Sequence, residues 1–204
     1  MIRIIGNIPI DCTVACSGGP DSMAVVDFLT RGKKNIRLAH FNHGTDHGDE
    51  AAEFVQDYAA KNGIELLYEC LSSTKPTSKS WEEWWRDCRY EFFRTIDGPV
   101  ITAHHLDDVA EWWVFSSLHG EGRLIPTYRD NVMRPFLSTP KSSLMRWCNK
   151  HDVPYVIDPT NTQGPHARST LRSEVMPGAY MINPGLRTVL KKKLLARENT
   201  GEKG

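Results

Sequence analysis

A short turn of small and acidic residues near the amino terminus constrains the fold of this chain more than any other stretch. It follows the apolar run 13–16, precedes the apolar run 23–29 and has the sequence Ser17-Gly18-Gly19-Pro20-Asp21-Ser22. A buried strand, a glycine turn and a helix start form an anion site in this order, because the first helical N–H groups lack intrahelical acceptors and point toward the turn. We therefore expect the turn to bind a phosphate, with Asp21 as a carboxylate suited to Mg²⁺. The alternative is a glycine turn that only caps a helix, and the absence of a following Gly-Lys-Ser/Thr excludes a Walker A loop.

Apolar runs and amphipathic stretches alternate along the chain, which is typical of an α/β fold. The pattern predicts strands at 13–16, 36–41, 64–71, 100–103 and 153–157, with a short strand at 132–135. It predicts helices at 21–31, 48–62, 81–96, from 104 to a break at 120–123, at 141–151, and from 167 onward with a break at 183–185. Gly63 should end the second helix, and Ser80 with Glu83 resembles a capping box. We expect a mainly parallel sheet of five strands with helices on both faces.

A second candidate site follows the predicted fourth strand. Its polar residues are His104, Asp107, Asp108 and Glu111. In an open α/β sheet this edge binds the ligand, and the spacings 104/108 and 107/111 place each pair on one side of the next helix. The carboxylates could hold Mg²⁺ against phosphates, or bind an amine nucleophile and accept its proton. The alternative is a solvated acidic first turn that the helix dipole favours.

The motifs of this chain resemble those of a known family. The pattern S-G-G-x-D-S resembles the PP-loop of the N-type ATP pyrophosphatase superfamily, and residues 102–111 are similar to the T-A-H-H-x-D-D-x-x-E block of tRNA(Ile)-lysidine synthetases. Further matches, in the same order, are residues 39–44 (A-H-x-N-H-G), 88–93 (R-Y-x-F-F), 134–137 (R-P-L-L) and 158–161 (D-x-S/T-N), followed by Arg168 and Arg172 (R-N-x-I-R). Six blocks in register make the resemblance specific. It implies an adenine nucleotide α-hydrolase-like, Rossmann-type domain.

The resemblance also implies a reaction and a set of site residues. Members of that family use ATP and Mg²⁺ to adenylate the C2 carbonyl oxygen of a tRNA wobble cytidine, and L-lysine then displaces AMP. The implied ATP-binding residues are Ser17, Gly18, Gly19, Pro20, Asp21, Ser22, His40, Asn42 and His43. The implied catalytic residues are Asp21, His104, Asp107, Asp108, Glu111 and Arg168, with Asp21 and Asp107 as Mg²⁺ ligands. RNA contacts are expected from Arg89, Arg168 and Arg172, the alternative for the last two being a solvated helix face.

Some residues depart from the family pattern. Tryptophans stand where the family has small residues, at Trp84, Trp85, Trp112 and Trp113, and serine follows Arg168 where the family has asparagine. The tryptophans could stack on a base, whereas core packing or a subunit contact is the interpretation we favour. The basic run 187–197 could contact RNA or form a solvated helix face.

Composition narrows the class of protein. The 204 residues suit a catalytic domain, 1–162, with a helical extension, 163–204. Basic and acidic residues number 25 each, so any RNA contact must come from a local patch. Five scattered cysteines, no C-x-x-C pair and no secretory leader favour a cytoplasmic location, and the apolar runs are too short for a membrane span. Because family members usually continue into tRNA-holding domains, we expect a homo-oligomer or a partner that supplies this surface.

Three other functions stay open on the sequence. A tRNA thiolation enzyme would carry the same loop, although the absence of C-x-x-C disfavours it. An enzyme that joins an amine to a small acyl substrate would suit the neutral net charge. A nucleotide-binding interaction protein could retain the fold without turnover.

Overall fold

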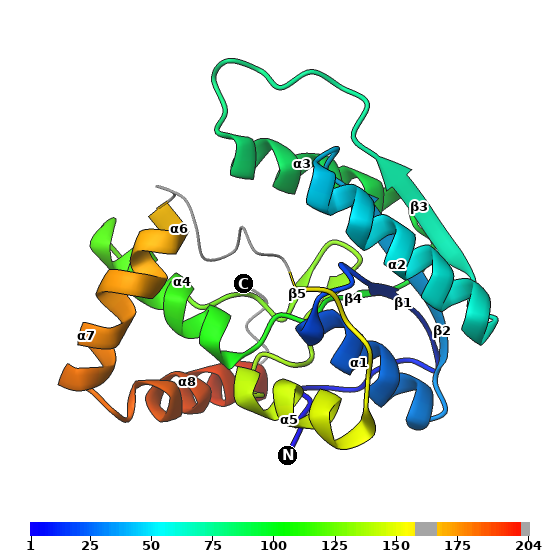
Figure 1. The fold of residues 1–204 in the computed structure, drawn as a ribbon. Helices are drawn as coiled ribbons and strands as arrows, with labels where there is room; N and C mark the ends of the chain where they lie inside the picture. The colour runs from blue at the N-terminus through cyan, green and yellow to red at the C-terminus, as the bar shows by residue number, and fades with distance from the viewer. Residues whose placement is uncertain (158–166, 201–204) are drawn as a thin grey trace.

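The computed structural model describes residues 1–157 and 167–200, without the side chain of Arg168. In this part of the chain a six-stranded sheet has the order β3-β2-β1-β4-β6-β5 (Figure 1). Its strands are β1 (Asp11–Ala15), β2 (Asn35–Asn42), β3 (Leu66–Cys70), β4 (Val100–Ile101), β5 (Tyr128–Arg129) and β6 (Val132–Met133). Every neighbouring pair is parallel except β5 with β6. The predicted α/β class and mainly parallel sheet are confirmed.

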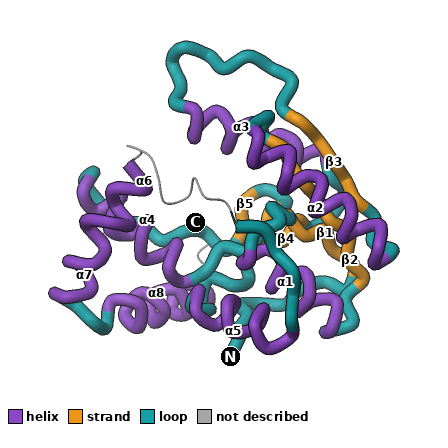
Figure 2. Tube along the Cα trace, in the orientation of Figure 1, coloured by secondary structure: helices purple, strands orange, loops and turns teal. Residues whose placement is uncertain are grey.

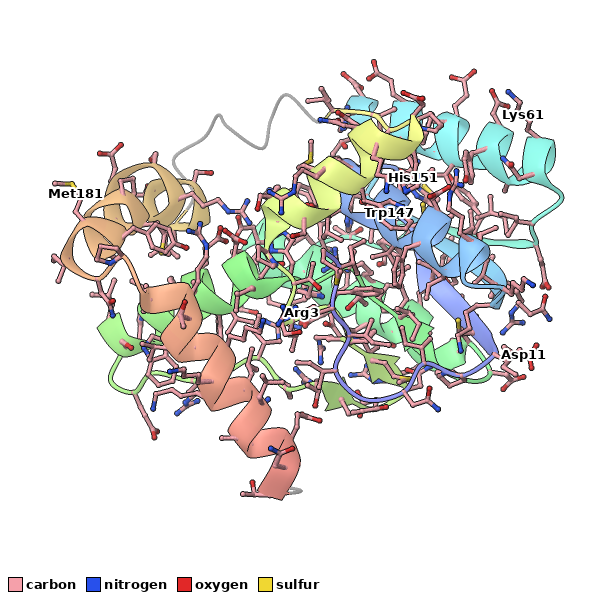
Figure 3. The ribbon with its side chains drawn as sticks, turned by 90° about the horizontal axis from the view of Figure 1, so that it is seen from below. Arg3, Asp11, Lys61, Trp147, His151 and Met181 are labelled. Atoms are coloured by element: carbon pink, nitrogen blue, oxygen red, sulfur yellow. The ribbon has the colours of Figure 1, made fainter. Side chains whose placement is uncertain are left out.

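Helices surround the strands, and a long loop joins β3 to α3 (Figure 2). The helices are α1 (Pro20–Arg31), α2 (Asp46–Asn62), α3 (Trp81–Thr95), α4 (Leu106–Leu118), α5 (Lys141–His151), α6 (Ala167–Thr170), α7 (Met176–Ile182) and α8 (Leu186–Thr200), and a π-helical turn (Leu171–Val175) joins α6 to α7. Helix α5 lies against α1, where the indole N–H of Trp147 donates to Asp27 at 2.8 Å (Figure 3). Because Trp147 lies in the second half of α5, this contact holds that part of the helix against α1.

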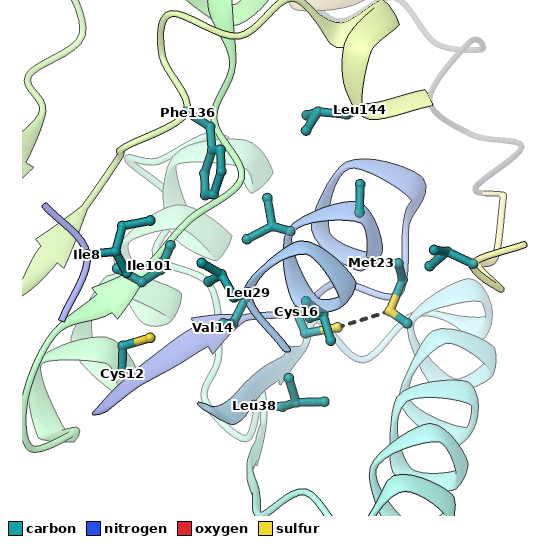
Figure 4. Close-up of a cluster of buried hydrophobic side chains, with 14 of the residues drawn as sticks. Ile8, Cys12, Val14, Cys16, Met23, Leu29, Leu38, Ile101, Phe136 and Leu144 are labelled. Atoms are coloured by element: carbon teal, nitrogen blue, oxygen red, sulfur yellow. Dashed lines mark hydrogen bonds between the residues drawn. The ribbon is translucent and has the colours of Figure 1, made fainter. Parts of the chain in front are cut away.

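The two faces of the sheet bury alternate residues, as the two-residue period of a strand requires. Val14, Leu38 and Ile101 belong to a core with residues of α1, α2 and α5 (Figure 4). Their neighbours Ala39 and Val100 belong to a second core with α3. Helices therefore cover both faces, as predicted.

A third apolar cluster joins the C-terminal helices to α4. Leu106 and Val109 of α4 share this cluster with Leu171 of the π-helical turn and with Leu190 and Leu194 of α8. The helical extension is thus packed on α4 through buried leucines. The predicted boundary between residues 162 and 163 lies outside the described residues, so the division into two domains stays a prediction.

Local helix signals are confirmed. Ser80 Oγ accepts the N–H of Glu83 at 3.2 Å, and the Glu83 carboxylate accepts the N–H of Ser80 at 3.0 Å. Gly63 follows α2 with φ of +63°, a left-handed conformation that glycine adopts readily. The predicted start of α2 at Gly48 is late by two residues, because Thr45 caps the helix by accepting the N–H of Gly48 at 3.1 Å.

The strand predictions are wrong at two places. Residues 153–157 form no strand: Pro154 has no N–H to donate, and the N–H of Val156 donates to the Gly18 carbonyl at 3.0 Å. The short strand predicted at 132–135 is confirmed as β6 (Val132–Met133), but its hairpin partner β5 was missed, because a strand of two residues has no detectable period and the turn is set by Asp130 with φ of +55°. The sheet therefore has six strands rather than five.

Within residues 1–157 and 167–200, no helix has both the length and the apolar character required to cross a bilayer.

Candidate active site

The Ser-Gly-Gly turn joins the end of β1 to the start of α1. Gly18 has φ of +77°, and a Cβ there would lie 3.1 Å from the Val156 side chain, so both conformation and space favour glycine. Ser22 Oγ accepts the N–H of Ser17 at 3.2 Å and donates to the Gly19 carbonyl at 2.9 Å. Gly19 is the N-cap of α1, and no side chain caps this helix. The turn therefore has the shape and the open helix start that a phosphate needs.

Asp21 lies in the first turn of α1 between two cationic groups. Its Oδ2 is 3.6 Å from His105 Nε2 and 3.3 Å from Lys141 Nζ. Burial alone would raise the pKa of Asp21, but the hydrogen bond and charge of His105, together with Lys141, outweigh it and lower the pKa. The carboxylate is therefore ionised at neutral pH.

The second oxygen of Asp21 decides whether Mg²⁺ fits this site. Among the described residues, Asp21 Oδ1 is buried and accepts no hydrogen bond. The described residues also contain no group of three histidine, cysteine or acidic side chains able to hold a metal ion by themselves. Because Mg²⁺ is usually held by one or two carboxylates together with substrate phosphates, one unmatched carboxylate oxygen beside a phosphate turn fits this ion.

The start of α4 differs from the prediction. The helix begins at Leu106 with His105 as its N-cap, so His104 precedes the helix and does not share a helical face with Asp108. His104 Nδ1 instead lies 2.8 Å from Thr102 Oγ1 at the end of β4. The predicted 104/108 pair is therefore wrong, because the capping residue is the second histidine of the motif.

His105 is a buried residue of the site that the sequence analysis missed. Asp108 Oδ2 accepts the N–H of His105 at 2.8 Å, and His105 Nδ1 accepts the N–H of Asp108 at 3.3 Å. In the neutral ring this leaves the proton on Nε2, the atom that faces Asp21. Burial lowers the pKa of His105, but Asp21 and Asp108 outweigh burial and raise it. The i,i+3 spacing of the capping box was the signal that could have revealed this role.

Asp107 has partners for both of its oxygens. Oδ1 accepts from Arg187 Nε at 2.8 Å, and Oδ2 accepts the backbone N–H of Lys141 at 2.8 Å. Arg187 in turn lies over the ring of Tyr180, 4.0 Å from its centre. Asp107 thus joins the starts of α4, α5 and α8.

Glu111 is held by an arginine from the π-helical turn. Arg172 Nε donates to Glu111 Oε1 and Oε2 at 2.9 Å each, and Arg172 also lies 3.8 Å from Asp108 Oδ1. The Glu111 hydrogen bond is the main cause of a raised pKa for Arg172. Single π-helical turns occur frequently at functional sites.

A continuous row of charged groups therefore extends from the phosphate turn to Glu111. In spatial order its members are Lys141, Asp21, His105, Asp108, Arg172 and Glu111. Cations and carboxylates alternate along the row. The structure thus brings the two predicted sites together. His105, Asp108 and Arg172 connect the carboxylate of Asp21 to the carboxylate of Glu111.

Of the predicted ATP residues His40, Asn42 and His43, the first two belong to β2 and the third follows it. His40 is 3% exposed, its Nδ1 lies 2.8 Å from the Cys16 carbonyl, and burial lowers its pKa. Asn42 accepts the N–H of Gly44 at 2.9 Å and donates to Asp49 at 2.7 Å. These contacts shape the loop at the end of β2.

His43 packs against Trp85 of α3, with ring centres 5.3 Å apart. Burial, and then the charge of Arg89, lower the pKa of His43 to about 4. Arg89 therefore lies near the β2 loop. The predicted side chain of Arg168 and the motif 158–161 lie outside the described part of the structure.

The tryptophans, for which base stacking was the alternative to core packing, belong to different clusters. Trp84 packs with the α3 core, whereas Trp113 packs with the α4 and α8 cluster. Among the basic residues of α8, Arg187 contacts Asp107, and Arg197 donates to the Ile125 carbonyl at 2.8 Å. The favoured interpretation, core packing, is confirmed for Trp84 and Trp113.

Comparison with known proteins gives consistent matches. A tRNA(Ile)-lysidine synthase of Persephonella marina is 30% identical over 191 residues, covering 85% of this chain and 42% of that protein. One from Thermotoga maritima is 30% identical over 188 residues, covering 84% of this chain and 45% of that protein. The chain thus spans less than half the length of these relatives.

The fold is also similar to that of a solved structure. The U34-tRNA thiolase NcsA from Methanococcus maripaludis, solved with its [4Fe-4S] cluster, superposes with a TM-score of 0.72 at 16% identity, covering 93% of this chain and 74% of that chain. The family described as PP-loop domain matches residues 9–179, which include the phosphate turn, the start of α4 and Arg172. This chain belongs to the PP-loop domain family.

Proposed function

We propose that this chain is an ATP-dependent ligase that adenylates the C2 carbonyl oxygen of a tRNA wobble cytidine and then replaces AMP by lysine. One observation carries the proposal: a carboxylate that already binds a cation, Glu111, is connected to the carboxylate of the phosphate turn, Asp21, through His105, Asp108 and Arg172. A phosphate site beside a cation site suits a reaction that joins an amine to an adenylated base. The names of the curated relatives support this choice of substrates.

The first step would use the phosphate turn. The turn and the uncapped start of α1 would bind the ATP phosphates, and the unmatched oxygen of Asp21 would hold Mg²⁺. Magnesium, when bound, would screen the negative charge of the phosphates. The base oxygen then forms a bond to the α-phosphorus, the bond between the α-phosphorus and its bridging oxygen to the β-phosphorus breaks, and pyrophosphate leaves with that electron pair.

The second step would use Glu111 and Asp108. The Arg172 guanidinium marks the place of a cation between these two carboxylates, and we propose that the lysine ammonium replaces it there. A carboxylate accepts the ammonium proton, the free amine forms a C–N bond to C2, and the C–O bond to AMP breaks. Arg172, once displaced, is available for a phosphate or for RNA.

We assign Asp107 a positioning role. Since both of its oxygens already accept hydrogen bonds, Asp21 is the better Mg²⁺ ligand. The remaining proposals follow from the substrates. For ATP, we propose binding roles for His40, Asn42 and His43, and roles near the reacting groups for His104 and Arg168.

For tRNA, we propose that Arg89 contacts the RNA, that a second copy or a partner supplies further tRNA-binding surface, and that the protein is located in the cytoplasm.

One experiment tests the reaction. The protein is incubated with α-labelled ATP, total tRNA and lysine, and labelled AMP, pyrophosphate and lysine incorporation are followed separately. Lysine-dependent modification of tRNA with release of AMP supports the proposal, and Asp21→Asn should abolish it. Release of ADP, pyrophosphate release with RNA-free acyl substrates only, or ATP binding without any release would each replace the proposal by another function.

A further inference from the structure

Three arginines gather around one tyrosine at the edge of the sheet. The guanidinium carbons of Arg86, Arg129 and Arg134 lie 6.0, 5.9 and 6.0 Å from the centre of the Tyr90 ring. They come from α3, from the edge strand β5 and from the residue after β6. We call these four residues the arginine–tyrosine patch. The tertiary fold alone brings them together.

Arg134 forms the buried base of the patch. It is 3% exposed, donates to the Tyr90 hydroxyl at 2.8 Å and donates to the Pro126 carbonyl at 2.8 Å. Both acceptors are neutral. A buried guanidinium without a carboxylate partner is costly, and an anion held nearby by exposed cations would stabilise its charge.

Arg86 and Arg129 form the exposed part of the patch. Among the described residues, neither one nor Arg134 forms a salt bridge with a carboxylate. The neighbouring acids have other partners: Asp87 accepts from Lys79 at 2.6 Å, and Asp130 lies 3.4 Å from Arg94. Lys79 and, more weakly, the charge of Arg86 lower the pKa of Asp87, but within the described chain no carboxylate forms an ion pair with an arginine of the patch.

We propose that the arginine–tyrosine patch binds phosphates of an RNA backbone. Guanidinium groups match phosphate geometry with paired N–H donors, and a chain of zero net charge must attract RNA through such a local cluster. The patch also connects to the candidate active site along α3, because Trp85, which contacts His43, directly precedes Arg86. The choice of RNA rests on the proposed function.

The test is a fluorescence anisotropy titration of the protein with a labelled RNA stem-loop at several salt concentrations, without ATP. In the double variant Arg86→Gln, Arg129→Gln, affinity should fall about 5- to 30-fold, because two exposed charge contacts are lost. The slope of log affinity against log salt should become smaller in magnitude by about 1.4–1.8. The two substitutions should leave the unfolding midpoint of the protein at its wild-type value, since Arg134 and Tyr90 remain.

Matched variants separate the patch from general charge. Lys61→Gln with Lys150→Gln removes two exposed cations from α2 and α5, which cover the face opposite α3, and should change affinity less than twofold (Figure 3 shows Lys61). Arg86→Lys with Arg129→Lys keeps the charge and should restore the salt slope. If the glutamine variant binds RNA as the wild type does, the patch proposal is wrong while the proposed function stands.

Two other outcomes also overturn the patch proposal. If the variant loses binding of labelled poly-glutamate but keeps its affinity for RNA, the patch binds an acidic protein. If the wild-type chain binds no RNA, both the patch proposal and the RNA substrate of the proposed function fail.

Discussion

Asp107 offers the sharpest test of how the carboxylates of the site divide their roles. The sequence suggests a Mg²⁺ ligand, whereas its oxygens accept from Arg187 and from the first N–H of α5. We expect Asp107→Asn to lower the stability of the protein and to leave its Mg²⁺ requirement unchanged.

The magnitude follows from these two contacts. A hydrogen bond to a charged group contributes about 1.5–3 kcal/mol when solvent is excluded, but the Arg187 side chain is 43% exposed, which reduces the contribution of the ion pair to roughly 0.5–1 kcal/mol. The asparagine oxygen can still accept one N–H, although without charge. The free energy of unfolding should therefore fall by roughly 1–2 kcal/mol, and the thermal midpoint by about 2–8 °C.

The assay is thermal unfolding followed by circular dichroism, with and without Mg²⁺, together with ATP turnover as a function of Mg²⁺ concentration. Asp57→Asn, an exposed acid of α2, is the matched control and should shift the midpoint by less than about 2 °C on this scale. Arg187→Gln should cost about as much as Asp107→Asn, and the double variant should cost less than the sum. An unchanged midpoint together with a raised Mg²⁺ requirement would refute the positioning role and restore Asp107 as a metal ligand.

Four further outcomes are expected. Asp21→Asn should stay folded, with a lower unfolding midpoint because the contacts with His105 and Lys141 lose the carboxylate charge, and should lose roughly 10²- to 10³-fold in ATP turnover, measured as pyrophosphate release; a wild-type rate would remove this residue from the site. Glu111→Gln should slow lysine transfer by about 10²-fold in single-turnover experiments while adenylation continues, and equal slowing of both steps would argue against the amine site. Because the pKa of His43 is about 4 in the folded chain, the unfolded chain binds more protons between pH 6.5 and 4, and the free energy of unfolding should fall by at most about 3 kcal/mol as the pH is lowered through this window. His43→Gln should flatten this dependence of stability on pH, and an unchanged dependence would show that the folded chain leaves the His43 ring open to solvent. The raised pKa of His105 has the opposite sign: its stabilisation is complete below pH 6.5 and is lost as pH rises through the folded value, so the wild type should lose stability over this range relative to His105→Asn, and parallel curves would contradict the contact with Asp21.

The sequence determined the elements of this protein that depend on neighbouring residues. The phosphate turn, the capping box at Ser80 and the left-handed Gly63 require only contacts within a few positions, and each was predicted. The order of strands and helices was predicted down to the short β4, because apolar periodicity is also local. Where the local signal was weak, as in the two-residue strand β5, the prediction failed.

The tertiary structure decided which charged groups are partners. Arg187 contacts Asp107 across 80 positions of sequence, and Arg172 contacts Glu111 across 61. The spacing of the acids in the sequence does not distinguish Asp107, whose two oxygens both accept hydrogen bonds, from Asp21, which has one oxygen without a donor. The donors to Asp107 come from distant helices that reach α4 only after the chain has folded. The contact of His105 with Asp21 could not be predicted from the sequence either, since the ring faces this carboxylate only when the starts of α1 and α4 meet at the edge of the sheet. The sequence specifies the chemistry of each side chain, but the electrostatic environment of each charged group depends on the packing of distant elements.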